Sequence, residues 1–173
     1  GFRDNYTSAK KSMGAVTSND SLGRYSVAAI DFLQAEDLAT IQYQAAMQCS
    51  YLSGVLDLSK TQVQTIEKSA FSGCTGLTGV ILPDTLEVLG AADGSSGSVF
   101  NGCSGLEFVR TANSEESTVF ELPAGLKAIG KQTFRNAFSA EMDVKVVIPE
   151  SVETIGSEAF YSGRISQIVV KRQ

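Results

Sequence analysis

Hydrophobic positions recur along the chain with a period of about 25 residues. A phenylalanine marks the pattern at Phe71, Phe100, Phe134 and Phe160, and Ala46 stands in the equivalent place one unit earlier. Aligned on this position, the sequence forms five units and the opening strand of a sixth. Such self-similarity is typical of solenoids, in which each repeat buries its apolar face against its neighbours. The pattern therefore predicts a solenoid of about five coils.

Each unit also contains a short apolar, β-branched segment, such as residues 79–82 (GVIL). A segment of this kind predicts one strand per coil, stacked in parallel about 4.8 Å from the next. The strand positions are Leu33, Leu58, Leu82, Leu122, Ile148 and Val170, and a proline follows three of them at Pro83, Pro123 and Pro149. Proline is tolerated there because its missing N–H lies beyond the strand ladder.

Glycines follow the next hydrophobic column at Gly90, Gly130 and Gly156, and they predict a tight bend or an unusual φ angle. Residues 36–48 allow two interpretations. The spacing of apolar residues predicts a helix with one buried face, whereas the repeat alignment makes this segment the first coil. Both interpretations hold if the outer side of the first coil is helical.

Two insertions interrupt the period, at residues 91–98 (AADGSSGS) and near residues 111–118. The composition of the first predicts a flexible loop. Residues 106–122 alternate between apolar and polar on both sides of a polar centre, which predicts a projecting hairpin. We expect residues 1–25 to form an N-terminal arm or cap. Residues 26–173 then form the solenoid, with an atypical first coil at 30–54.

The repeat resembles the BspA-like (Treponema pallidum-type) leucine-rich repeat. Residues 80–90 (VILPDTLEVLG) followed by 99–106 (VFNGCSGL) carry the resemblance, and residues 148–160 (IPESVETIGSEAF) are its closest copy. The resemblance covers roughly residues 55–170 and weakens toward the N-terminus. It implies a mainly β or α/β fold: a right-handed leucine-rich-repeat superhelix with one parallel strand per coil. It also implies a secreted or surface-attached adhesin of bacteria or some protists, which contacts host matrix proteins or other cells.

Composition argues against several classes of function. The chain has no histidine, which removes the commonest general base and metal ligand. No phosphate-binding loop, dinucleotide fingerprint or zinc spacing is present, so we expect no catalytic residues, cofactor or metal. A net charge of −5 without a basic cluster argues against nucleic acid. The sequence has no apolar run long enough to span a membrane, and no signal peptide is recognised in it.

The three cysteines, Cys49, Cys74 and Cys103, occupy one column of the repeat. Later units place Ala137 and Gly163 in the same column, so the position selects for small size. Parallel Cα–Cβ vectors on stacked coils fit disulfide geometry poorly. We therefore expect three buried, unpaired thiols rather than a metal site or a redox pair.

The solenoid geometry favours a binding module for a protein or glycan partner, for example a host matrix protein. Apolar residues at outward-facing strand positions can mark the binding surface. The candidate partner-binding residues are Ile81, Phe108, Glu121, Lys145, Val147 and Val169. Alternatively, packing between coils or the inserted hairpin covers these residues. The other function considered is a structural spacer or accessory domain of a larger surface protein. By the resemblance, either function is extracellular or at the cell surface.

Overall fold

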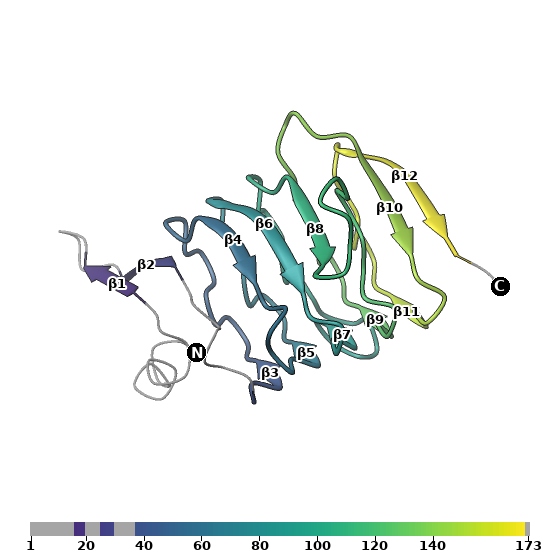
Figure 1. The fold of residues 1–173 in the computed structure, drawn as a ribbon, viewed down its shortest axis with the longest axis horizontal. Helices are drawn as coiled ribbons and strands as arrows, with labels where there is room; N and C mark the ends of the chain where they lie inside the picture. Colours follow the sequence, from purple (N-terminus) through teal and green to yellow (C-terminus); the bar gives the residue numbers. More distant parts are fainter. Residues whose placement is uncertain (1–15, 20–24, 30–36, 172–173) are drawn as a thin grey trace.

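The computed structural model describes residues 16–19, 25–29 and 37–171. From residue 37 onward the chain winds as a parallel-strand β solenoid of about five turns (Figure 1). This part of the chain contains no helix, so the helix predicted for residues 36–48 is wrong where it can be compared. Residues 37–49 form the strand β3 and a series of turns instead, as the repeat alignment indicated.

The long strands line one side of the solenoid in two sheets. Three of them form a parallel sheet in the order β4-β6-β8, and the last two form a separate parallel pair, β10-β12 (Figure 1). Their bounds are Gly54–Asp57 (β4), Leu77–Leu82 (β6), Phe108–Thr111 (β8), Val144–Ile148 (β10) and Ile165–Val170 (β12). The predicted strands at Leu58, Leu82, Ile148 and Val170 are thus found, each at or just before the named residue.

A second strand in each coil, which the sequence did not indicate, builds another sheet. Five two-residue strands are hydrogen-bonded in the order β11-β9-β7-β5-β3. They are Thr40–Ile41 (β3), Thr65–Ile66 (β5), Val88–Leu89 (β7), Ala128–Ile129 (β9) and Thr154–Ile155 (β11). Their second residues form the hydrophobic column that precedes the glycines. Within the described residues, each coil from β4 to β11 therefore has two strands rather than the single one predicted.

The N-terminal region contains one described element outside the solenoid. Val16–Asn19 (β1) pairs antiparallel with Tyr25–Ala29 (β2), as an irregular two-stranded sheet. This hairpin lies within and just after the segment expected to be an arm or cap. The predicted strand position Leu33 and the start of the first coil lie outside the described residues.

The phenylalanine column forms a stack through the core. Phe71, Phe100, Phe134 and Phe160 follow one another with ring centroids 5.7, 5.7 and 5.6 Å apart and interplanar angles of 6°, 17° and 9°. The first three rings are fully buried, and the fourth is partly exposed on the last coil. Offset aromatic pairs of this kind add to the stabilisation from burial alone. The phenylalanine column of the repeat alignment is thus confirmed as a continuous stack of rings.

The backbone is left-handed two residues before each of the five phenylalanine-column positions and two residues after the first four of them. The φ angles lie between 50° and 75° two residues before the position and two residues after it. In the second coil, the N–H of Phe71 donates to the carbonyl of Val99 in the next coil (3.0 Å), and those of Ser69 and Gly73 donate likewise (2.8 Å each). The left-handed residues are Gln44, Ser69, Ser98, Gln132 and Glu158 before the position, and Gln48, Gly73, Gly102 and Asn136 after it.

At two of its three positions, Gly130 and Gly156, the glycine column is explained by close packing and not by the predicted bend or unusual φ angle. Gly90 does have a positive φ of 95°, but Gly130 and Gly156 do not. A Cβ at Gly130 would overlap the carbonyl oxygen of Ser96, and one at Gly156 would overlap that of Gly94. The inserted residues 91–97 therefore lie directly against the next two coils. The loop that was predicted to be flexible is packed, with Gly94 and Gly97 buried.

The second insertion also differs from its prediction. Thr111, at the end of β8, is in register with Leu82, so the strand of this coil is β8 and Leu122 is not part of a strand. The chain then loops back and runs beside β8 a second time, in parallel, through a bridge between Val109 and Phe120. A hairpin would be antiparallel, so the hairpin prediction is wrong. Leu122 is nevertheless buried in the core.

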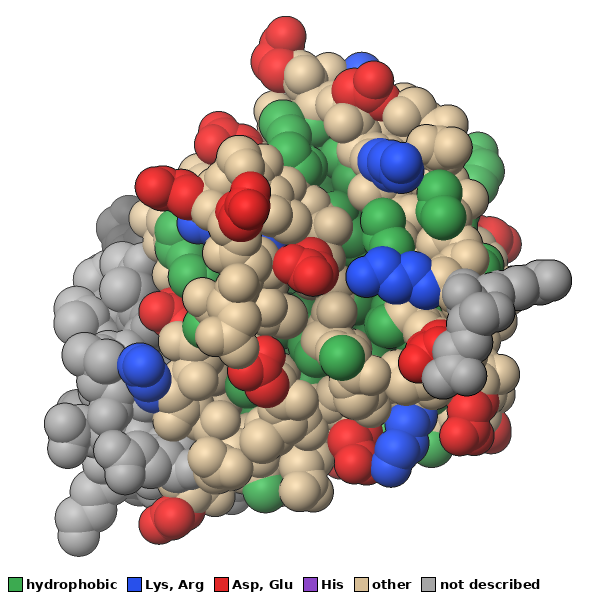
Figure 2. Space-filling view, turned by 45° about the vertical axis from the view of Figure 1, so that its right-hand side comes forward, with side chains coloured by type: hydrophobic (Ala, Val, Ile, Leu, Met, Phe, Trp, Pro, Cys, Tyr) green, Lys and Arg blue, Asp and Glu red, His purple; other side chains and the backbone are tan. Residues whose placement is uncertain are grey.

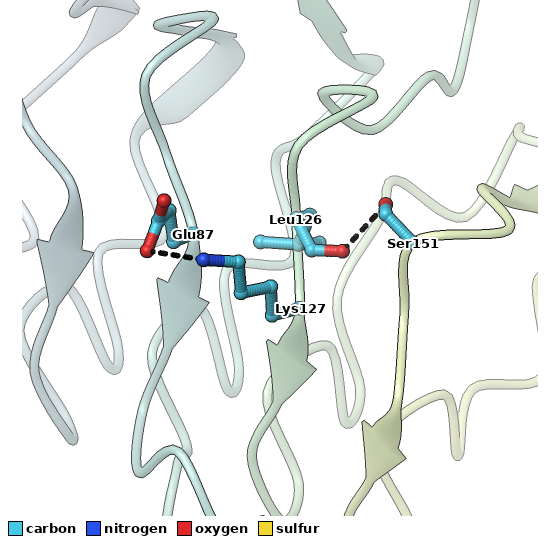
Figure 3. Close-up of polar contacts among 4 residues, drawn as sticks. All are labelled: Glu87, Leu126, Lys127 and Ser151. Carbon is cyan, nitrogen blue, oxygen red and sulfur yellow. Dashed lines mark hydrogen bonds and ion pairs between the residues drawn. The ribbon is translucent and has the colours of Figure 1, made fainter.

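Polar side chains also connect neighbouring coils. The Lys127 ammonium lies 3.0 Å from the Glu87 carboxylate on the preceding coil, and the Ser151 hydroxyl donates to the carbonyl of Leu126 at 2.7 Å (Figure 3). The ion pair is about half exposed on both sides, at 54% and 46%, so it contributes little to stability. The hydrophobic columns and the backbone ladders hold the coils together.

Candidate interaction surface

The side chains of the long strands alternate between the core and one exposed surface, which we call the outward face. In β10, for example, Val144, Val146 and Ile148 are buried, whereas Lys145 is exposed and Val147 is half-buried. The parallel register carries this alternation from strand to strand. The outward face comprises Val55, Asp57, Gly79, Ile81, Phe108, Arg110, Val119, Glu121, Lys145, Val147, Gln167 and Val169.

All six candidate partner-binding residues lie on this face, but they do not form one patch. Val147 is the register neighbour of Val169, and Lys145 is the neighbour of Gln167. Ile81 instead adjoins Arg110 in the other sheet. The second pass of the chain beside β8 lies between these two groups. The structure therefore brings together Lys145, Val147 and Val169 and separates them from Ile81 and Phe108.

Phe108 is covered by its own neighbours. Its ring lies over Gly79 on the adjacent strand, where a Cβ would overlap the ring. The Arg110 guanidinium lies 4.5 Å from the centroid of the same ring, a cation–π contact. Arg110 also donates to the carbonyls of Glu115 and Glu116 in the second insertion. This part of the outward face is thus occupied by the side chains and loop of the chain itself.

A network of hydrogen bonds holds the second insertion against the ends of the strands. The Ser114 hydroxyl accepts from the N–H of Thr111 at 3.0 Å and donates to the Glu121 carboxylate. The Asn113 amide donates to the Asp84 carboxylate at 2.7 Å. Glu121, a candidate binding residue, is therefore a structural acceptor inside this network. Its position indicates a role in fixing the loop.

The outward face is divided between β8 and β10. The N–H of Val109 donates to the carbonyl of Val119, and the N–H of Glu121 donates to the carbonyl of Val109, both at 2.8 Å. Among the described residues, β10 pairs with β12 only. We call Lys145, Val147, Gln167 and Val169 the C-terminal part of the outward face. Val55, Asp57, Ile81, Phe108 and Arg110 form the N-terminal part.

Sequence reasoning missed several members of this face. Val55, which is 47% exposed, and Asp57 belong to a coil without a proline marker, and Gln167 belongs to the last strand. Arg110 was missed because the strand was placed at Leu122 instead of at Thr111. The signal that would have identified them is the alternation of inward and outward side chains along each strand. In this alternation every second residue, such as Val55 and Asp57, lies on the outward face.

Apolar side chains are also exposed at the C-terminal end of the solenoid. Ile168 and Val170 are in register with the buried Val146 and Ile148, yet they are 51% and 55% exposed, since β12 has β10 as its one strand partner among the described residues. In the view from this side, hydrophobic side chains lie in a hollow between Asp and Glu side chains on its left and Lys and Arg side chains on its right (Figure 2). Apolar area and both signs of charge thus lie close together here.

The thiols have the character of core residues. All three are free; Cys74 and Cys103 are fully buried, whereas Cys49 is only partly buried, contrary to the expectation for that residue. The Cys74 and Cys103 Sγ–H groups donate to the carbonyls of Ala46 and Phe71, each at 3.1 Å. Burial raises the pKa of all three thiols above the usual range, that of Cys103 to about 12. A neutral thiol is a poor nucleophile and a poor metal ligand.

Among the described residues, no group of three or more histidine, cysteine, aspartate or glutamate side chains has the arrangement to hold a metal ion. No helix in the same part of the chain is sufficiently long and apolar to span a membrane.

Comparison with known proteins gives a family and a fold. The model of the BspA type Leucine rich repeat region matches in 6 copies, over residues 39–117 and 108–173. No curated protein matches the chain. Two crystal structures of leucine-rich repeat proteins are similar to it. The protein from Bacteroides ovatus ATCC 8483 is 22% identical with a TM-score of 0.59, and the Treponema pallidum protein is 21% identical with a TM-score of 0.56.

The matches differ in the share of each chain that they cover. They cover 90% and 89% of this chain, but 39% of the Bacteroides protein and 67% of the Treponema protein. The chain therefore corresponds to less than half of the Bacteroides protein. At these identities, the two structures show a shared fold.

Proposed function

The chain belongs to the BspA-type leucine-rich repeat family, and from this premise we propose that it is a binding module that recognises a protein or glycan through the outward face of its long strands. The family suggests a repeat module for binding, and leucine-rich repeats of this fold are generally non-enzymatic. The absence of histidine from the whole sequence agrees with a non-enzymatic role.

The observation that carries the proposal is the pairing of Val147 and Val169 on the C-terminal part of the outward face. The two side chains are register neighbours on adjacent strands, and both are half-buried. Exposed Lys145 and Gln167 lie beside them in the same register. An apolar centre with a polar rim is the usual anatomy of a protein interface. In the N-terminal part, by contrast, Phe108 is already covered.

We place this module at the cell surface or outside the cell, where it contributes to adhesion. Support for this comes from the family, whose members are typically secreted or attached to the surface. The partner is then a host matrix protein or a molecule on another cell. The long strands of a solenoid offer an extended surface for such a contact, and the pair β10-β12 forms its C-terminal part.

The test compares the Val147→Asp/Val169→Asp double variant with the unmodified protein against purified matrix proteins and glycans, by surface plasmon resonance. Charge introduced into a desolvated contact should weaken binding at least about 30-fold, as for a hot spot of 2 kcal/mol or more. The matched control is Val55→Asp, on the N-terminal part of the same face. Val55→Asp should alter the free energy of unfolding by about 0.5 kcal/mol or less. The double variant places like charges opposite each other at half-buried positions and should cost about 1–2 kcal/mol, so urea unfolding must show that it is folded under the binding conditions.

Equal binding by the double variant and the control would refute the assignment to the C-terminal part. The spacer function makes the opposite prediction, because a spacer binds nothing in the panel and gains no stability from any of its members. Ligand-dependent stabilisation, measured by thermal unfolding with and without each candidate, separates the two functions.

A further inference from the structure

The first insertion forms one wall of a small cavity on the surface. The cavity has a volume of about 200 Å³ and is open to solvent. Two coils and the inserted loop contribute to it. Its lining residues are Lys68, Ser69, Ser95, Ser96, Gly97, Ser98, Lys131 and Gln132. This volume is below the range of about 300–1,000 Å³ that is usual for drug-sized ligands, so the cavity suits a single chemical group.

Backbone hydrogen bonds fix the wall of the cavity to the coils on both sides. The N–H of Ser69 donates to the carbonyl of Gly97 at 2.8 Å. The N–H of Ser98 donates to the carbonyl of Lys131 at 2.7 Å, and the N–H of Lys131 donates to the carbonyl of Gly94 at 3.1 Å. The close approach of the loop to Gly130 and Gly156 supports the same placement. The backbone of the cavity wall is therefore held in place before any ligand arrives, while the exposed Lys68 and Lys131 side chains extend from it.

The two lysines of the cavity are not neutralised by carboxylates. Lys68 lies over the Tyr43 ring at 4.9 Å from its centroid, and neither Lys68 nor Lys131 forms an ion pair within the described residues. Lys127 on the same solenoid, by contrast, is paired with Glu87 (Figure 3). The lining thus contains two lysines and no carboxylate, on a chain whose net charge is −5, although the Gln132 amide donates to the Glu158 carboxylate at 2.9 Å.

The hydroxyl groups of the cavity are also available. In the described part of the chain, those of Ser69, Ser96 and Ser98 have no hydrogen-bond partner. The one carboxylate of the inserted loop, Asp93, is occupied differently. It accepts from the N–H of Ser95 at 2.9 Å, and hydrogen bonds from Ser95 lower its pKa. The lining thus combines two lysines that have no carboxylate partner with serines whose hydroxyls are unpaired, and these are residue types that bind oxyanions.

We propose that this cavity binds the oxyanion of a sulfate or phosphate ester, with Lys68 and Lys131 supplying charge and the serine hydroxyls supplying hydrogen bonds. Ammonium groups bind such anions as point charges, while neutral donors complete the hydrogen bonding of the remaining oxygens. The site lies apart from the outward face and does not depend on the function proposed for that face.

The test is a titration of the ¹⁵N-labelled protein at constant ionic strength, followed by NMR. The titrants are sodium sulfate, sodium phosphate, a monosaccharide sulfate and a monosaccharide phosphate. Saturable shifts of the Ser96 and Gly97 amide signals are expected with at least one anion. The relative affinities for the two sugar esters show which ester the site prefers.

Two lysine variants make the test specific. Lys131→Gln should weaken binding about tenfold, because it removes one of the two positive charges of the site. Lys127→Gln, which removes the same charge from an ion pair outside the cavity, should change the affinity less than twofold. If Lys131→Gln perturbs the fold, Ser96→Ala replaces it and should weaken binding in the same way. Shifts that do not saturate, or equal losses in Lys127→Gln and Lys131→Gln, would overturn the proposal.

Discussion

Replacing Phe134 with alanine tests whether the aromatic stack is the main source of stability. Phe134 is fully buried and has four aromatic neighbours. It stacks on Phe100 and Phe160 at 5.7 and 5.6 Å, meets Phe120 edge-on at 5.4 Å, and lies 6.3 Å from Phe138. A buried phenylalanine lost to alanine costs about 3–5 kcal/mol, and each aromatic pair is worth about 0.5–1.5 kcal/mol beyond burial. We therefore expect Phe134→Ala to cost about 5 kcal/mol.

Phe71 provides the comparison within the same column. It is as buried as Phe134, but Phe100, at 5.7 Å, is its one aromatic neighbour among the described residues. We expect Phe71→Ala to cost about 3–4 kcal/mol, at least about 1 kcal/mol less than Phe134→Ala. The difference isolates the aromatic contacts, because the side chain removed is the same.

Urea unfolding followed by far-ultraviolet circular dichroism measures both variants. With a slope of about 2 kcal/mol per molar urea, a loss of 5 kcal/mol lowers the midpoint by about 2.5 M. A midpoint that does not change in Phe134→Ala would show that the ring is not part of the core. A loss in Phe71→Ala equal to or larger than that in Phe134→Ala would refute the argument from aromatic neighbours.

Three other predictions follow from the thiols and from the backbone. In the native protein, a thiol reagent should modify Cys49 slowly and leave Cys74 and Cys103 unmodified. All three thiols should react after denaturation. Rapid reaction of Cys103 in the native protein would contradict its burial. Burial raises the Cys103 pKa from 9.0 to about 12, so the stability that the neutral thiol provides is complete below pH 9 and is lost as the pH rises toward 12. Cys103→Ala should therefore flatten the alkaline fall of the unfolding free energy, and an unchanged slope would count against this. Gln48 has an exposed side chain and a φ of 59°, which glycine adopts more readily than glutamine. We therefore expect Gln48→Gly to raise the free energy of unfolding by about 0.5–1 kcal/mol, measured by urea unfolding. Gly73→Ala, at a φ of 75°, should lower the free energy of unfolding.

The repeat columns could be predicted because burial selects residue type at every coil. The phenylalanine stack, the strands near Leu58, Leu82 and Ile148, and the family all follow from that selection. The cysteine column was recognised for the same reason, since alanine and glycine fill the equivalent position later in the chain. Cys49 is more exposed than predicted because it belongs to the first described coil, which has a neighbour on one side only among the described residues.

The insertions could not be placed from the sequence. A repeat alignment assigns the strand position of each coil to the apolar residue that best continues the pattern, even where a polar residue occupies that position in the structure. Leu122 precedes a proline as Leu82 does, so it was placed in the strand, although Thr111 occupies that position. Thr111 is polar and gave no hydrophobic signal; its hydroxyl forms a hydrogen bond with that of Ser114. The packed loop at 91–98 was missed because its contacts depend on glycines of two later coils.

The outward face was predicted in part: six of its residues were named from the sequence, but several others and the arrangement of all of them were not. Alternation along a strand places Val147 and Val169 outward, and the register of β10 and β12 makes them neighbours. The covering of Phe108 by Arg110 depends on Gly79 of the preceding strand, which no periodicity indicates. The left-handed backbone positions were also missed, because glutamine, serine, asparagine and glutamate occupy several of them and none of these marks a turn as strongly as glycine.

The extra pass of chain beside β8 gives the two sides of the solenoid different mechanical properties. On the side of the short strands, β7, β9 and β11 are hydrogen-bonded without interruption. On the side of the long strands, β8 and β10 are not paired with each other, and Phe120 packs between the two blocks of coils. Backbone pairing is thus continuous along one side of the solenoid and interrupted on the other, where aromatic packing spans the interruption. A force that separates the two blocks would meet strand pairing on the short-strand side and mainly side-chain packing on the other, so we expect the long-strand side to yield first.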